Sequence, residues 1–272
     1  MKPIFVGQKM SDHGTSNPIV ARLGPQVTEL CDFFRLTKEQ KEGIFGVLFA
    51  NVGKRCLECF DIHSDFEAKI LSIREEIAEK GLQYQSNGKV LSLPSMPSVR
   101  ENAERFLYVA KSSLRDLQGI FKVFFGKDFG SGANYTEVIK WSQKTYGVDD
   151  PLTKQLNENY DHWIKELIAK RNAVEHPGGH SGHLRIKDYS TVIQDGTIKI
   201  CEPIWYRNSD KPSHILNDME IYVHTCFTFA EEIFVLCLLK IEPLVRGTMR
   251  IAEIPENQRR KEMPIRFRMV TI

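Results

Sequence analysis

The sequence lacks a strong imbalance of charge and a long uninterrupted apolar run. Its 272 residues carry a formal net charge of +2, so the chain as a whole is not basic enough to attract nucleic acid through its net charge. The most apolar stretch, residues 226–239, contains Glu231 and Glu232 and is too short to span a bilayer. We therefore expect this stretch to be a core helix, and we expect no membrane association.

The sequence also lacks the marks of secretion and of a structural metal site. No N-terminal segment combines a basic start, an apolar run and a cleavage site, so we expect no signal peptide. Cys56 and Cys59 form a lone C-x-x-C, and no second pair at fitting spacing completes a zinc site. The six cysteines fall mostly in helical or strand patterns, as buried free thiols do in a reducing compartment. These features predict a cytoplasmic protein with no metal and no cofactor.

The sequence contains no internal repeat and no low-complexity tract. Apolar residues make up 42% of the chain and charged residues 26%, which is typical of a folded globular protein. We expect a single domain over residues 1–272. Within it we expect a leader at 1–36, a helical core at 37–241 that contains a β-hairpin at about 184–206, and a β tail at 242–272.

Helical signals dominate the core. Thr37-Lys-Glu-Gln40 matches a capping box, and apolar residues then recur at steps of three and four up to about residue 80. The same periodicity covers residues 99–125, and Asp150-Pro151 predicts the start of a later helix. The expected fold class is mainly α: an up-and-down bundle of four to five long helices with a hairpin insertion and a C-terminal β tail.

The β signals lie in the second half of the chain. Residues 184–194 and 197–206 flank Asp195-Gly196, the dipeptide that favours a type I′ hairpin turn. Strand-like runs occur around 249–254 and 265–270. From residue 246 the tail holds seven Lys or Arg against three Glu, which suits either an RNA backbone or a strand with Arg266 and Arg268 on its solvated face.

The best candidate for chemistry is the end of the helix that begins at Pro151. Counted at about 100° per residue from Leu152, Arg171 falls within the apolar stripe of this helix. A cation there is costly unless it is paired. Two interpretations are open: a local salt bridge to Glu175, or a guanidinium reserved for a phosphate.

His176 is the second candidate residue of this corner. Because it precedes Pro177, it is biased away from helical conformation, and we expect it to leave the helix and turn its ring outward. An imidazole at a helix C-terminus can transfer protons near neutral pH, and Asn172, four residues earlier, can orient it. The alternative is a histidine that only caps the helix.

Arg171-Asn-Ala-Val-Glu-His176 resembles the R-x4-6-H motif of the HEPN superfamily, including the polar residue directly after the arginine. The surrounding helical pattern, roughly residues 38–241, is also similar to that all-α family. The resemblance implies a homodimeric, metal-independent RNA endonuclease, of the kind found in toxin–antitoxin and defence systems, with a protein antitoxin as a possible partner.

The resemblance also implies roles for the three residues. His176 would act as general base or acid, Arg171 would hold the scissile phosphate, and Asn172 would position one of them. The product would carry a 2′,3′-cyclic phosphate. The alternative within the same family is a catalytically inactive helical module that binds a nucleotide, RNA or a protein partner.

Two weaker patterns lie near the same corner. His176, His180 and His183 share a Gly-rich loop at spacings of four and three, but no Cys, Asp or Glu lies among them, and we do not expect a metal site. Residues 126–132 are rich in glycine but lack the G-K-[ST] ending of a phosphate-binding loop.

Overall fold

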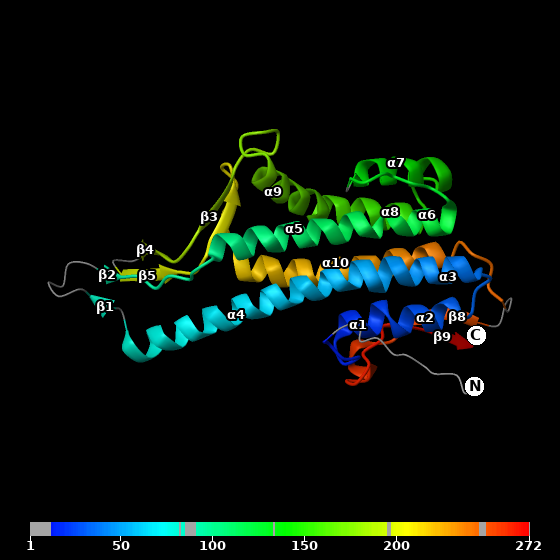
Figure 1. Cartoon of the computed structure of the whole chain (residues 1–272), viewed down its shortest axis with the longest axis horizontal. Helices are drawn as coiled ribbons and strands as arrows, with labels where there is room; N and C mark the ends of the chain where they lie inside the picture. Colours follow the sequence, from blue (N-terminus) through cyan, green and yellow to red (C-terminus); the bar gives the residue numbers. More distant parts are fainter. Residues whose placement is uncertain are drawn as a thin grey trace, which may run out of the picture. The chain divides into compact units, whose positions relative to one another are not determined.

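The protein is mainly α-helical, with small antiparallel sheets (Figure 1). The computed structural model describes residues 12–81, 83–84, 91–132, 134–194, 197–244 and 249–271. The chain divides into two compact units. The first unit comprises residues 1–57, 113–157 and 227–272, and the second comprises residues 58–112 and 158–226. Three long helices have residues in both units, and the expected single domain stays a prediction.

The three shared helices are α4 (Lys54–Lys80), α5 (Val99–Leu117) and α10 (Ile215–Leu238). The short helix α8 (Pro151–Asn159) also has its last two residues in the second unit. The first unit further contains α1 (Pro18–Leu23), α2 (Pro25–Cys31), α3 (Lys38–Phe45), the π-helical segment η1 (Gly46–Gly53), α6 (Gly119–Phe125), α7 (Tyr135–Tyr146), β8 (Met249–Glu253), the short 3₁₀ turn η3 (Glu256–Gln258) and β9 (Phe267–Thr271).

The second unit holds the end of the long helix predicted to start at Pro151. After α8 the helix continues through the π-helical segment η2 (Tyr160–Ile164) into α9 (Lys165–Glu175). The strands of the second unit are β1 (Gln83–Tyr84), β2 (Leu91–Ser92), β3 (Leu184–Lys187), β4 (Ser190–Gln194), β5 (Thr197–Cys201), β6 (Ile204–Arg207) and β7 (Ser213–His214).

Local capping residues begin the helices where the sequence predicts. At the start of α3, the Thr37 hydroxyl accepts a hydrogen bond from the Gln40 N–H at 3.2 Å. The Gln40 side chain in turn accepts one from the Thr37 N–H at 3.0 Å, so the capping box is confirmed. At the start of α8, the Asp150 carboxylate accepts from the Leu152 N–H at 3.0 Å. Both caps satisfy backbone donors that a helix leaves unpaired at its start.

The described residues form more helices than the four to five expected. The predicted helix over 99–125 is broken at Gln118, where two bonds of the tighter i to i−3 type replace the α-helical pattern. The predicted leader contains α1 and α2, whose apolar side chains are buried. Both corrections concern short segments, for which periodicity is a weak signal. Residues 1–11 of the predicted leader lie outside the described residues.

The hairpin and the tail pair agree with the sequence pattern. Strands β3 and β6 pair antiparallel with Leu184 opposite Arg207, and β4 and β5 pair with Ser190 opposite Cys201. The two ladders therefore keep one register, and β7 adds to β6. The predicted turn dipeptide Asp195-Gly196 lies outside the described residues. In the first unit, β8 pairs antiparallel with β9.

The core of the first unit encloses a charged network around Glu231 of α10, which is fully buried. Arg22 of α1 forms a two-pronged ion pair with this carboxylate, one N–H bond being 2.9 Å long. Gln26 of α2 donates to the same carboxylate at 2.7 Å. The Gln26 side-chain oxygen accepts from the backbone N–H of Phe267 in β9 at 2.7 Å. One buried carboxylate thus joins α1, α2, α10 and β9.

Helix α10 is also long and apolar enough to span a membrane by length and composition. Within its most apolar window, 67% of the helix is buried inside the protein. Such burial is typical of the core helix of a soluble protein, as the sequence predicts. The cytoplasmic location stays a prediction.

We predict that Glu231→Ala strongly destabilises the protein, because Arg22 would remain buried without its partner. Breaking a buried ion pair costs about 3–5 kcal/mol. Urea unfolding followed by circular dichroism measures the loss. The control is Glu137→Ala, which breaks an ion pair with Lys140 whose side chains are 53% and 68% exposed and so costs less than about 1 kcal/mol. Equal losses in the two variants contradict the structural role of Glu231.

Candidate functional site at the end of helix α9

Helix α9 ends one residue before His176, as the sequence predicts. His176 has φ −131° and ψ 70°, and its N–H donates to the Asn172 carbonyl at 2.8 Å. The residue is exposed, so the imidazole can meet a molecule from solution. Pro177, which follows, prevents the chain from continuing the helix.

The loop after His176 is held in place by backbone contacts. The N–H of Gly178 donates to the Gly182 carbonyl at 3.0 Å, and the His183 N–H donates to the Asn208 side chain at 2.9 Å. Gly182 has φ +75°, and a Cβ atom there would lie 2.0 Å from the Asn208 side-chain oxygen. The positive φ favours glycine at this position, because other residues would be strained there.

The three histidines of this loop do not gather into a metal site. All three are exposed. Across the part of the chain that the structure describes, no three His, Cys, Asp or Glu side chains come together in a way that would hold a metal ion.

The Arg171 guanidinium lies between a carboxylate and an aromatic ring. One terminal nitrogen is 3.0 Å from Glu175 Oε1, and the side chain is 12% exposed. The guanidinium carbon lies 5.3 Å from the centre of the Tyr108 ring on α5. The Arg171 Nε is buried and has no hydrogen-bond partner within the described ranges. The local salt bridge considered from the sequence is therefore present, but it uses only part of the guanidinium.

Lys111 of α5 binds both polar neighbours of Arg171. Its Nζ lies 2.8 Å from Asn172 Oδ1 and 3.0 Å from Glu175 Oε2. The Asn172 side-chain oxygen is thus held by Lys111, whereas it is the Asn172 main-chain carbonyl that contacts His176. Asn172 therefore links α5 to the corner, and its expected role in orienting the imidazole stays a prediction.

Glu175 is the anion at the centre of this cluster. Partial burial raises the pKa of Glu175, but the hydrogen bond from Lys111 and the charges of Lys111, Arg171 and His176 outweigh that effect. The net result is a pKa below the ordinary value of 4.5. Around one carboxylate the site thus collects two permanent cations and one histidine, which favours a second anion from solution.

Lys170 is a buried cation that the sequence reasoning missed. It is 6% exposed, and its Nζ lies 2.9 Å from Asp218 Oδ2 on α10 and 4.9 Å from the centre of the Trp205 ring. A signal was available, because Lys170 follows Trp163 and Leu167 at helical steps of four and three. Lys170 is fully engaged inside the protein, which makes it a structural residue.

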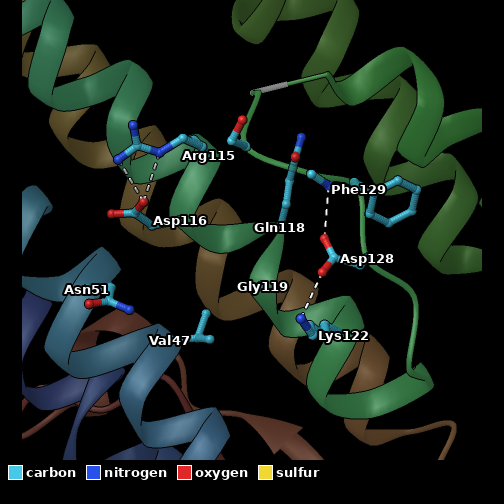
Figure 2. A pocket seen from close by; sticks show the side chains of 11 residues that line it. Val47, Asn51, Arg115, Asp116, Gln118, Gly119, Lys122, Asp128 and Phe129 are labelled. Carbon is cyan, nitrogen blue, oxygen red and sulfur yellow. Dashed lines mark hydrogen bonds and ion pairs between the residues drawn. The ribbon is translucent and has the colours of Figure 1, made fainter.

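A pocket in the first unit is a second candidate site. It has a volume of about 350 Å³ and is lined in part by residues 128–131 of the glycine-rich segment (Figure 2). Its charges are already paired: Arg115 binds Asp116 at 3.0 Å, and Lys122 binds Asp128 at 2.8 Å. Asp128 also accepts from the Gly130 N–H, which removes a donor that could hold a phosphate. The pocket therefore gives no indication of a particular ligand.

The basic tail is the third candidate. The expectation that Arg266 lies on a solvated strand face is wrong, because its side chain is only 17% exposed. It binds Glu232 at 2.7 Å and Glu253 at 2.8 Å. Arg268, by contrast, is exposed. The internal carboxylates neutralise Arg266, which weakens the interpretation of the tail as a patch for an RNA backbone.

Comparisons with models of known protein families, with curated proteins and with solved structures found no match.

We predict that the Glu175 cluster stabilises the protein in a pH-dependent way. Because folding lowers the pKa of Glu175 below 4.5, its contribution is present above pH 4.5 and is lost as the pH falls through the lower, folded value. The difference in unfolding free energy between the wild type and Glu175→Gln is therefore expected to shrink between pH 6 and pH 3, measured by urea unfolding. Glu79→Gln, at an exposed position of α4, is the control. A difference that does not change with pH contradicts this assignment.

Proposed function

We propose that this chain is a HEPN-like, metal-independent RNA endonuclease that acts through Arg171 and His176, with Asn172 in support. The observation that carries the proposal is the exposed imidazole of His176 at the end of the helix that also carries Arg171. A proton-transferring group and a phosphate-binding group at one corner are what RNA cleavage without metal requires. The segment from Arg171 to His176 resembles the R-x4-6-H motif, and this resemblance supports the same function.

The contact between Arg171 and Glu175 is compatible with phosphate binding. The carboxylate occupies one terminal nitrogen of the Arg171 guanidinium. A hydrogen bond to a charged group contributes about 1.5–3 kcal/mol. A phosphate that accepts two N–H bonds from the guanidinium would make one such bond more than the carboxylate makes, which favours exchange of the two anions.

The chemistry follows from the groups present. The ribose 2′-oxygen attacks the adjacent phosphorus, a new P–O2′ bond forms, and the bond from phosphorus to the 5′-oxygen breaks. His176 either takes the proton of the 2′-hydroxyl or donates a proton to the leaving 5′-oxygen. Arg171 offsets the charge that develops on the phosphate oxygens. The products are a 2′,3′-cyclic phosphate and a free 5′-hydroxyl.

The proposal includes a homodimer in which two such corners meet. One imidazole cannot be both base and acid in the same step, and a second copy supplies the other group. The proposal also includes an up-and-down arrangement of the helical core and a cytoplasmic location. It further includes a protein antitoxin as the partner that inhibits the enzyme.

We predict that the wild-type protein cuts RNA in the presence of EDTA and that His176→Ala slows cleavage by roughly 10²- to 10⁴-fold, the usual contribution of a general acid or base. Gel analysis of a labelled RNA gives the rates, and mass spectrometry identifies the cyclic phosphate. The matched control is His180→Ala, which removes another exposed histidine of the same loop and is expected to leave cleavage unchanged. Circular dichroism verifies that both variants fold.

The same assay separates the two candidate functions. If the wild type binds RNA or a nucleotide through Arg171 but cuts no RNA, the catalytically inactive binding module becomes the better description. Arg171 already holds the Glu175 carboxylate with one terminal nitrogen, and binding of an anion is all that this second function requires. Cleavage that persists in His176→Ala rules out the assigned catalytic role.

A further inference from the structure

Helix α5 adds two residues to the corner that the motif does not include. Tyr108 and Lys111 lie one helical turn apart on α5. Tyr108 contacts Arg171, and Lys111 contacts Asn172 and Glu175 (helices α5 and α9 in Figure 1). All of these residues belong to the second unit. The surface around the motif is therefore built from two helices.

The Glu175 carboxylate bridges the two cations of this surface. Its Oε1 lies 3.0 Å from an Arg171 terminal nitrogen, and its Oε2 lies 3.0 Å from Lys111 Nζ. Two oxygens of one anion thus bind one donor each from α9 and α5. A phosphate group presents two oxygens in the same forked arrangement and carries a charge of the same sign. The position of the carboxylate marks a place where a phosphate can bind.

Tyr108 offers an aromatic surface beside that position. The residue is 48% exposed. The Arg171 guanidinium lies over its ring, which fixes the two groups relative to each other. Exposed aromatic rings next to cations bind unstacked bases of single strands, because every base has a face that can stack. A base within a duplex has no free face to offer.

We propose that Tyr108, Lys111 and Arg171 form a subsite for one unstacked nucleotide of single-stranded RNA. The base stacks on Tyr108, the phosphate binds between Lys111 and Arg171, and Glu175 holds the phosphate position when no RNA is bound. The choice of RNA as the ligand rests on the proposed function. The arrangement of the subsite rests on the contacts between α5 and α9.

The first test measures binding without cleavage. A fluorescent 2′-O-methyl oligonucleotide lacks the attacking hydroxyl, and anisotropy gives its affinity for the full-length protein as a single strand and as a duplex. We expect the single strand to bind more tightly. Tyr108→Ala is expected to weaken single-strand binding by about 5- to 150-fold, as loss of one stacked base does, and Tyr108→Phe to restore most of it. Phe45→Ala, which removes another exposed aromatic ring in α3, is the control.

The second test asks whether removal of the Glu175 charge raises or lowers the affinity for single-stranded RNA. If its carboxylate holds the phosphate position, Glu175→Gln raises the affinity for the single strand by roughly 3- to 10-fold, because a competing negative charge is removed. If Glu175 serves only to hold the helices, the same variant leaves the affinity unchanged or lowers it. Lys111→Met is expected to lower the affinity and to reduce the salt dependence by about 0.7 in log–log slope, the value for one lost phosphate contact on a single strand.

The outcomes separate this subsite from the catalytic proposal. A protein that cuts RNA but binds duplex as well as single strand, with Tyr108→Ala and Glu175→Gln at wild-type affinity, retains the proposed function and overturns the subsite. A protein that shows the expected pattern of binding but cuts no RNA retains the subsite and loses the catalytic role. Absence of any RNA binding by the wild type overturns both.

Discussion

The first unit depends on neutralising one carboxylate, that of Glu231 in the most apolar helix. A buried charge is tolerated only when it is paired and hydrogen-bonded. The pairing groups come from elements far apart in the sequence: Arg22 lies 209 positions away, and Gln26 carries the network on to β9. The same constraint that makes Glu231 costly therefore fixes where the first helices and the C-terminal strands must pack.

The second unit repeats this physical principle with the opposite charge. Lys170 is buried on α9, and Asp218 of α10 neutralises it while accepting a further hydrogen bond from the Ser213 hydroxyl at 2.6 Å. The aromatic rings of Trp205 and Tyr222 also face the ammonium group. Lys170, one residue before Arg171, is thereby held against Asp218 of α10. The buried cation thus anchors α9 to α10 beside the corner.

The sequence predicted the features that depend on near neighbours. The capping box at Thr37 and the end of α9 before Pro177 each need only a few adjacent residues, and the hairpin was expected from two runs that flank one turn dipeptide. Lys111 was beyond such reasoning, because its contacts with Asn172 and Glu175 span 61 and 64 positions. No local pattern distinguishes Lys111 from the arginines that α5 also carries, Arg100, Arg105 and Arg115. The positions of Arg171 and His176 were therefore predictable from one helix, whereas the contribution of Lys111 from α5 was not.

The two sequence interpretations of Arg171 describe the same geometry. A guanidinium that binds a local carboxylate with one nitrogen, while a lysine binds the other oxygen of that carboxylate, is a forked anion site already occupied by an internal anion. Pairing removes the cost of a partly buried cation in the free protein. It also preserves the arrangement that a phosphate needs, since exchange of one anion for another leaves the cations in place. A salt bridge at this corner is therefore no argument against the proposed phosphate binding; competition between the two anions would decide how tightly a phosphate is held.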